Sequence, residues 1–382
     1  MLETCAILYI NLGPYHVARL RALASTLPGL VAVQVADTQN LYPWQFTSAQ
    51  TGFQQVTLFS RPFESISSAE QVKAVHRALD DIKPAAIMMA GYFDPVMRAA
   101  ARWGRKHNVP RIMTTTTTVI DKPRWLPKEV LKGVWCRQHY NALCLPGQRS
   151  AAYFGGLGYP ESLIWLCGNV VDNAFFQSRS PGINRDDHAQ RSKIGLPEHY
   201  FLSVSRLSPE KNLRRLLKAY AGYQQRGGKW DLVIVGDGPQ EEELKQLAAA
   251  LKIFNIHFVG WKQYEDLPWY YGFASCFIMP SISEPWALVV NEAMASGLPV
   301  LVSRRCGCQP DLAHRGVNGF DFDPYNVEAL ANLMLRCSRG EMDLAAMGKQ
   351  SLEIIANYTP ETWALSVSDC FRATLQNLRK RR

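Results

Sequence analysis

Two glutamates, Glu284 and Glu292, are the first residues of this sequence whose type and spacing suggest chemistry. They follow an apolar run, Cys276–Met279, which predicts a buried strand, and a helix is expected to start between them and to end at Gly297. Carboxylates beyond the carboxyl end of a strand suit sugar hydroxyls. The unpaired backbone N–H groups of the helix start, on Trp286, Ala287, Leu288 and Val289, favour an anion such as a diphosphate. The stretch therefore predicts a site for a nucleotide sugar.

Arg206 and Lys211 form a second candidate pair. Arg206 follows the predicted strand Phe201–Ser205, and Ser208 with Pro209 predicts a helix start that places Lys211 in its first turn. A lysine there opposes the helix dipole at a cost of about 0.3 to 1 kcal/mol, unless an anion offsets it. We therefore predict a bound diphosphate, with an exposed ion pair to Glu210 as the alternative.

The elements that must position these residues alternate between apolar runs and helical patterns, which is typical of a doubly wound α/β fold with parallel strands. The length of 382 residues fits two domains. In the first half, strands are expected at Cys5–Ile10, Val31–Val35, Ala85–Ala90, Ile112–Met113, Ala142–Leu145 and Leu163–Cys167. In the second half they are expected at Phe201–Ser205, Leu232–Val235, Ile256–Val259 and Cys276–Met279.

The run from Glu284 to Glu292, followed by Ala-Met-Ala-Ser-Gly-Leu-Pro-Val, resembles the signature of the family 4 retaining glycosyltransferases. The resemblance implies a GT-B architecture, in which two Rossmann-like domains face a central cleft. It implies that Glu284 lies near the donor sugar, that Glu292 binds the ribose, and that residues 286 to 289 contact sugar and phosphates. It also matches Arg206 and Lys211 to a basic pair on the donor diphosphate. Ala287 departs from the glycine that is usual in the family.

The resemblance extends to the domain boundaries. It implies an acceptor-side domain over 1–172, a linker over 173–199, a donor-binding domain over 200–358, and a terminal segment, 359–382, whose helix packs back on the first domain. The linker is polar and contains Pro181 and Gly182. The segment Cys306 to Asp311 departs from the two glycines and the glutamate that contact sugar or phosphate in the family.

Further site residues are implied at the remaining loops. Gly13, in the turn after the first strand, has no side chain to block a phosphate and is expected to contact the donor. Trp261 is expected against the nucleobase. On the acceptor side we expect His16, with a packing role as the alternative, and Asp121, Arg124 and Lys132, which resemble positions of sugar transferases in polysaccharide assembly.

Charge and cysteine usage indicate the setting of the protein. The net charge is +9, and residues 98 to 137 hold ten Lys and Arg residues against only Asp121 and Glu129. This basic region predicts a face for anionic lipid headgroups, contacted through Arg102, Arg105 and Lys106, or for a pyrophosphate-bearing acceptor. The alternative is a solvated helix face. Nine cysteines without a disulfide pattern and the short apolar start predict a cytosolic protein. Peripheral attachment at the inner membrane face is expected if the basic region binds lipid, and no nucleic-acid partner is expected.

The predicted reaction is transfer of a hexose-like sugar from a nucleoside diphosphate sugar to a glycan or lipid-linked acceptor, with retention of configuration and no metal or other cofactor. Asp321 and Asp323 form an Asp-x-Asp pattern that chelates metal in a different glycosyltransferase fold, so a metal site is the alternative there. Two other classes of protein stay open: a nucleotide-sugar epimerase of the same architecture and a non-catalytic sugar-nucleotide-binding subunit.

Overall fold

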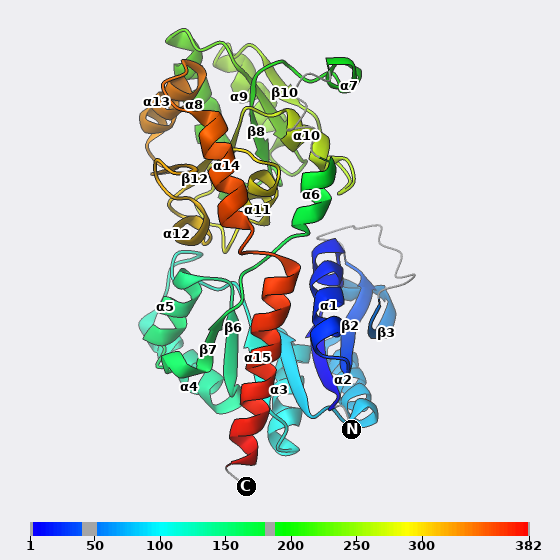
Figure 1. Ribbon diagram of the computed structural model, residues 1–382. Coiled ribbons are helices and arrows are strands. Elements are labelled where there is room, and N and C mark those ends of the chain that lie inside the picture. Colours follow the sequence, from blue (N-terminus) through cyan, green and yellow to red (C-terminus); the bar gives the residue numbers. More distant parts are fainter. Residues whose placement is uncertain (1–2, 40–51, 180–187, 381–382) are drawn as a thin grey trace. The chain divides into compact units, whose positions relative to one another are not determined.

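The computed structural model describes residues 3–39, 52–179 and 188–380, and its chain divides into two compact units (Figure 1). The first unit comprises Met1–Val119, Pro123–Val171 and Thr359–Arg382, and the second comprises Ile120–Lys122 and Asp172–Tyr358. Each unit is built on its own parallel sheet. Each unit is thus a doubly wound α/β fold, as the sequence predicts.

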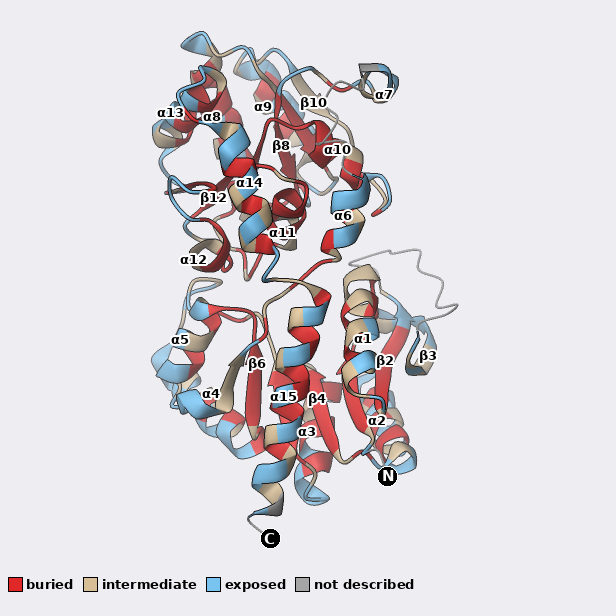
Figure 2. Cartoon of the chain, in the orientation of Figure 1, coloured by how far each residue is buried: buried red, intermediate tan, exposed pale blue. Residues whose placement is uncertain are grey.

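In the described part of the first unit, the sheet has seven strands in the order β3-β2-β1-β4-β5-β6-β7. The strands are β1 (Cys5–Tyr9), β2 (Leu30–Thr38), β3 (Gln54–Pro62), β4 (Ala86–Ala90), β5 (Arg111–Thr114), β6 (Ala142–Leu145) and β7 (Ile164–Leu166). The helices are α1 (Pro14–Thr26), α2 (Ser68–Ile82), α3 (Pro95–Lys106), α4 (Leu126–His139), α5 (Gln148–Gly156) and α15 (Pro360–Arg379). The central strands are almost wholly buried, as helices on both faces of a parallel sheet require (Figure 2).

In the described part of the second unit, six parallel strands follow the order β10-β9-β8-β11-β12-β13. They are β8 (Tyr200–Val204), β9 (Asp231–Val235), β10 (Ile256–Phe258), β11 (Cys276–Met279), β12 (Val300–Ser303) and β13 (Gly319–Phe322). The helices are α6 (Asn173–Arg179), α7 (His188–Ile194), α8 (Leu213–Gln225), α9 (Glu241–Ala250), α10 (Leu267–Phe273), α11 (Leu288–Ala295), α12 (Gln309–Leu312), α13 (Val327–Ser338) and α14 (Leu344–Ile355).

The last helix, α15, belongs to the first unit although the chain reaches it from the second. Thr359 starts it with a capping box, in which its side chain accepts a hydrogen bond from the backbone N–H of Thr362. α15 packs side by side with α1, and the hydroxyls of Thr26 and Ser368 lie 2.6 Å apart between the two helices (Figure 1). The N- and C-terminal segments of the chain thus share one core.

The segment predicted as a linker, 173–199, contains α6 and α7 and belongs to the second unit, while its residues 180–187, with Pro181 and Gly182, lie outside the described residues. The side-chain amide of Asn173 donates to the backbone carbonyl oxygens of Ile355 at 2.9 Å and Tyr358 at 3.3 Å. These bonds tie the first residue of α6 to the end of α14. The beginning of this segment is therefore packed into the second unit.

Candidate functional site

The strand order places Arg206, Lys211 and Glu284 at one point of the sheet of the second unit. The order reverses between β8 and β11, because the chain adds β9 and β10 on one side of β8 and β12 and β13 on the other. Ligands of open α/β sheets bind at such a switch point, outside the carboxyl ends of the strands. The loop after β8 carries Arg206 and Lys211, and the loop after β11 carries Glu284.

The loop after β8 differs from the predicted helix start. Pro209–Lys211 form a single 3₁₀ turn, and α8 begins only at Leu213. Asn212 separates the two with a left-handed backbone (φ 59°), and its buried side-chain amide donates to the carbonyl oxygens of Pro280 at 3.0 Å and Pro324 at 2.9 Å. Lys211 therefore ends a 3₁₀ turn instead of lying in the first turn of α8, so the helix-dipole argument for a bound anion does not apply to it.

Both basic residues of this loop have carboxylate partners. The ammonium of Lys211 donates to Oε2 of Glu284, and the two side chains are mostly buried. Arg206 donates to Oε1 of Glu210 at 3.0 Å, and the Ser208 hydroxyl donates to the same oxygen at 2.6 Å. Burial would raise the pKa of Glu210, but the hydrogen bonds from Ser208 and Arg206 outweigh it and lower that pKa. The predicted alternative, an exposed ion pair with Glu210, is thus present for Arg206.

The loop that holds Glu284 is supported by the segment after β12. The backbone carbonyl of Glu284 accepts from the N–H of Gly307 at 2.8 Å, and the carbonyl of Trp286 accepts from the N–H of Cys308 at 3.2 Å. A Cβ atom on Gly307 would lie 1.8 Å from the carbonyl oxygen of Pro285, so only glycine fits there. The segment Cys306–Asp311, which departs from the family pattern, thus supports the site, because its Cys-Gly-Cys part pairs with the backbone of the Glu284 loop.

The start of α11 lies directly after this loop. Ala287 precedes the helix with a left-handed backbone (φ 87°, ψ 75°), which explains why glycine is usual at this position in the resembling family. Trp286 is buried and donates from Nε1 to Oδ1 of Asn291 at 3.0 Å. Leu288 and Val289 form the first turn, whose N–H groups have no partner within the helix, as at any helix start. The predicted anion-binding amides are therefore at a helix start.

Glu292, the second glutamate of the motif, is completely buried. Its Oε2 accepts a hydrogen bond of 2.6 Å from the hydroxyl of Tyr271 in α10, which is also completely buried. Sequence reasoning missed Tyr271, because nothing in the motif points to a tyrosine in another helix. The bond orients the carboxylate for which the resemblance implies a contact with the ribose.

In the first unit, Gly13 and His16 lie together at the carboxyl end of β1. Gly13 precedes α1, and its N–H donates to Nδ1 of His16 at 3.1 Å. Burial, with a contribution from the Arg19 charge, lowers the pKa of His16 to about 3. His16 is therefore neutral at pH 7, and it orders the Gly13 turn by accepting its N–H.

Arg124 and Lys132 lie in a hydrogen-bonded cluster of the first unit. The ammonium of Lys132 donates to Oε1 of Glu129 at 2.6 Å and to the hydroxyl of Tyr153 at 2.6 Å, and the guanidinium of Arg124 lies 3.7 Å from Oε1 of Glu129 and 4.7 Å from the centre of the Tyr153 ring. Burial would raise the pKa of Glu129, but hydrogen bonds from Lys132 and Tyr153 lower it. The predicted acceptor-side cations thus have an internal carboxylate partner.

Two further predicted residues lie in the second unit. Asp121 belongs to the short piece Ile120–Lys122, and its backbone carbonyl accepts a 2.5 Å bond from the hydroxyl of Ser283, next to Glu284. Trp261 follows β10 and is partly exposed. β10 is separated from β8 by β9, so Trp261 lies farther along the sheet than Arg206.

The Asp-x-Asp pattern has arginine partners. Asp321 accepts from Nε of Arg304 at 2.5 Å and from Nε of Arg315 at 2.9 Å. Burial would raise the pKa of Asp321, but these two guanidinium groups lower it. Within residues 3–39, 52–179 and 188–380, no group of three or more His, Cys, Asp and Glu side chains is placed to hold a metal ion.

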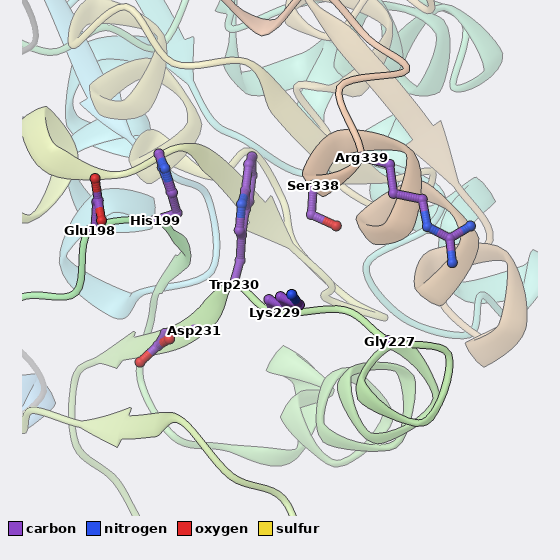
Figure 3. Close-up of a pocket in the computed structure, with 8 residues that line it drawn as sticks. All are labelled: Glu198, His199, Gly227, Lys229, Trp230, Asp231, Ser338 and Arg339. Carbon is purple, nitrogen blue, oxygen red and sulfur yellow. The ribbon is translucent and has the colours of Figure 1, made fainter.

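The second unit also has a cavity of about 500 Å³ at the opposite edge of its sheet (Figure 3). It is lined by Glu198, His199, Gly227, Lys229, Trp230, Asp231, Ser338 and Arg339. β8 and β9 begin beside these residues, whereas Arg206 and Glu284 follow the carboxyl ends of β8 and β11. This cavity contains none of the predicted site residues.

The comparison with protein families gives a match within the second unit. Residues 184–353 match the family described as glycosyl transferases group 1. The chain is 34% identical over 164 residues to the amylovoran biosynthesis glycosyltransferase AmsK of Erwinia amylovora, an alignment that covers 40% of each chain. It is 35% identical over 234 residues to the sulfoquinovosyl transferase SQD2 of Arabidopsis thaliana, covering 58% of this chain and 43% of that protein. The alignments thus span less than half of these two relatives.

Solved structures resemble the chain over nearly its full length. HepE of Anabaena, in complex with UDP and glucose, superimposes with a TM-score of 0.75 at 19% identity, covering 97% of this chain and 99% of that one. Sucrose-phosphate synthase of Thermosynechococcus elongatus gives a TM-score of 0.76 at 19% identity, covering 97% and 98%. At these identities the likeness establishes the fold. Residues 184–353 therefore match the glycosyl transferases of group 1, and the two parallel sheets of the chain form the GT-B fold.

Proposed function

We propose that this protein transfers a sugar from a nucleoside diphosphate sugar to a glycan or lipid-linked acceptor, with retention of anomeric configuration and without a metal. The observation that carries the proposal is the meeting of Lys211 with Glu284 at the β8–β11 switch point, directly before the start of α11. A cation, a carboxylate and unpaired helix-start amides are the groups that a diphosphate linked to a sugar needs. The names of AmsK and SQD2 agree with transfer of a sugar, and HepE is a structure in complex with UDP and glucose.

In the proposed reaction, Arg206 and Lys211 neutralise the diphosphate as the glycosidic bond breaks. The N–H groups of Leu288 and Val289 add donors at the start of α11. Stabilising the charge that develops on the leaving group is usually the largest single contribution to such catalysis. The donor phosphates then replace Glu284 as the partner of Lys211. The Glu284 carboxylate is thereby free to accept a hydrogen bond from a hydroxyl of the donor sugar. The leaving phosphate takes the proton of the acceptor hydroxyl on the same face.

The ribose and nucleobase assignments complete the donor site. Glu292 binds the ribose hydroxyls from its place in α11, oriented by Tyr271. Trp261 contacts the nucleobase, and Gly13 contacts the donor phosphates from the first unit. His16, Asp121, Arg124 and Lys132 serve the acceptor side, where Arg124 and Lys132 act as a cluster ordered by Glu129.

The test begins with the donor. Thermal unfolding of the full chain is followed with a panel of UDP, GDP, ADP and dTDP sugars, and the sugar that raises the midpoint is used for turnover. We expect transfer to an added glycan or polyprenyl-phosphate acceptor, with the anomeric configuration of the product, read by NMR, equal to that of the donor. Glu284→Ala should reduce turnover more than nucleotide affinity. Inversion at the anomeric carbon would refute the retaining mechanism.

The two other classes of protein are separated by the same samples. An epimerase converts the nucleotide sugar when no acceptor is present, so product analysis without acceptor identifies it. A non-catalytic subunit binds the donor and forms no product with any acceptor. Neither class requires both a ribose-binding and a sugar-binding carboxylate beside a basic pair, which is why we favour the transferase.

A further inference from the structure

The outer side of α4 exposes large apolar side chains where a surface helix normally carries polar ones. We define the α4 apolar face by its exposed members: Trp125 (62% exposed), Leu126 (74%), Val130 (56%), Leu131 (70%) and Val134 (40%). Leu126, Val130 and Val134 are four residues apart and therefore lie in one row along the helix. The opposite side of α4 is buried through Gly133, Cys136 and His139.

Another helix of the same unit, α2, shows the contrast. α2 also has one buried side, formed by residues such as Val75 and Leu79, but its exposed side carries Lys73, Arg77 and Asp80. Contiguous exposed apolar side chains mark a surface that binds something. The α4 apolar face is therefore a candidate binding surface, and the charges around it indicate the chemical class of its partner.

The charges next to the α4 apolar face are cationic. Lys128 is exposed on α4, with its ammonium 5.5 Å from the centre of the Trp125 ring. α3 lies beside α4, since the Arg98 guanidinium is 4.9 Å from the centre of the Trp135 ring. The exposed cations of α3 are Arg102, Arg105 and Lys106.

The acidic side chains of this region do not offset those cations. Between residues 95 and 139 the sequence has two acids, Asp121 and Glu129. Glu129 is mostly buried against Lys132, and Asp121 belongs to the piece that clusters with the second unit. The exposed charged side chains of residues 95–139 are therefore all cationic, while the exposed side of α4 is apolar in its centre.

We propose that the α4 apolar face, with the cations of α3, docks the protein on an anionic lipid surface, with α4 lying in the interface plane. Apolar side chains enter the boundary between headgroups and acyl chains, and the Lys and Arg side chains contact lipid phosphates. A second copy of the chain fits less well, because a symmetric contact would bring the same cations together. In the described residues no helix is long and apolar enough to cross a membrane, and this docking needs none.

The inference deepens the proposed function by placing a lipid-linked acceptor within reach of the first unit, and it rests on that function only for the acceptor. Docking is measured without turnover. Vesicle binding without nucleotide-sugar binding would leave the docking in place and remove the proposed function. Nucleotide-sugar binding without vesicle binding would do the reverse.

The charge component is tested by co-sedimentation of the full chain with vesicles of phosphatidylcholine and phosphatidylglycerol, or of phosphatidylcholine alone, at low and high salt. We expect binding to the anionic vesicles that weakens as salt rises. Each cation near such a surface contributes roughly a five-fold gain, so replacing three should weaken binding roughly 100-fold. The variant is Arg102→Glu, Arg105→Glu and Lys106→Glu, and its control for net charge is Lys218→Glu, Lys229→Glu and Lys349→Glu, at exposed lysines of the second unit.

The apolar component is tested by Leu126→Ser with Leu131→Ser, which should weaken vesicle binding roughly ten-fold or more. Phe254→Ser is the matched control, because Phe254 is 70% exposed in the second unit and is expected to leave binding unchanged. Both Leu side chains are exposed, so the fold should be retained, and the thermal shift with nucleotide sugar verifies this.

Three results would overturn the proposal. The first is equal or absent binding of the wild-type chain to the two kinds of vesicle. The second is a Leu126→Ser, Leu131→Ser variant that binds anionic vesicles as the wild type does, which would leave charge alone as the cause. The third is a wild-type dimer, detected by light scattering, that this variant converts to a monomer, which would identify the α4 apolar face as a contact between copies.

Discussion

The hydrogen bond between Glu292 and Tyr271 allows ribose binding to be separated from structural support. Both side chains are completely buried, and the Tyr271 hydroxyl donates to Oε2 of Glu292 at 2.6 Å. Glu292→Ala removes the carboxylate, whereas Tyr271→Phe removes only the donor and keeps the carboxylate in α11. The two variants therefore break the same bond but differ in the group that the proposal assigns to the ribose.

The expected magnitudes follow from what each change leaves unpaired. Glu292→Ala deprives the ribose hydroxyls of their acceptor, which should weaken nucleotide binding by about 1 to 3 kcal/mol, or roughly 5- to 150-fold in Kd. It also leaves the Tyr271 hydroxyl buried without this acceptor, at a cost of about 1 to 3 kcal/mol in the free energy of unfolding. Tyr271→Phe should lower stability by a similar amount and change nucleotide affinity little. The double variant should recover part of the stability, since neither partner then remains.

The assay is isothermal titration calorimetry with the nucleoside diphosphate of the preferred donor, paired with urea unfolding of each variant. Wild-type nucleotide affinity in Glu292→Ala would refute the ribose assignment. An equal loss of affinity in both single variants would mean that Glu292 acts through the packing of α10 and α11. Only a loss confined to variants without the carboxylate supports direct contact.

Three further predictions concern the donor site, its support and the pH dependence of stability. Lys211→Ala should lose most transferase activity while excess chelator leaves the wild type active; activity abolished by chelation and restored by magnesium or manganese would instead require a metal. Gly307→Ala should lower stability by roughly 2 kcal/mol or more and impair turnover, because its Cβ would meet the Pro285 carbonyl, whereas Gly155→Ala, with open space around it, should do neither. For His16, burial lowers the folded-state pKa from 6.5 to about 3, so the unfolded chain binds more protons between these values. The contribution of neutral His16 to the free energy of unfolding is complete above pH 6.5 and falls by about 2 kcal/mol from pH 7 to pH 5. His16→Asn should remove this fall when urea unfolding is measured at the two pH values. A variant with the same pH dependence as the wild type would contradict the prediction.

Much of the fold is determined by local sequence. The runs Ala142–Leu145 and Cys276–Met279 are strands with the predicted bounds, because strands of a parallel sheet covered on both faces must be apolar throughout. β3 was not predicted, because a strand at the edge of the sheet does not need to be apolar throughout. It is an edge strand with partly exposed side chains, so Gln54–Pro62 has no continuous apolar run.

The site shows the same division between local and distant information. The spacing of Glu284 and Glu292 about a helix start is a property of one short segment, and the sequence alone predicts it. The pairing of Lys211 with Glu284 and the bond from Tyr271 to Glu292 join residues far apart in the chain. Such contacts depend on which strands become neighbours, and short-range periodicity carries no record of strand order.

The supports of the site depend most on tertiary structure. Gly307 is one glycine among many in the sequence, and only its approach to the Pro285 carbonyl explains why a side chain is excluded there. Asn212 likewise delays the start of α8 because two distant carbonyl oxygens, of Pro280 and Pro324, hold its side chain, which overrides the local preference of Ser208 and Pro209 to begin a helix. The sequence by itself thus determined which residues are candidates for the chemistry. Packing between distant segments decided how these residues are held, since contacts of this kind join residues that only the strand order brings together.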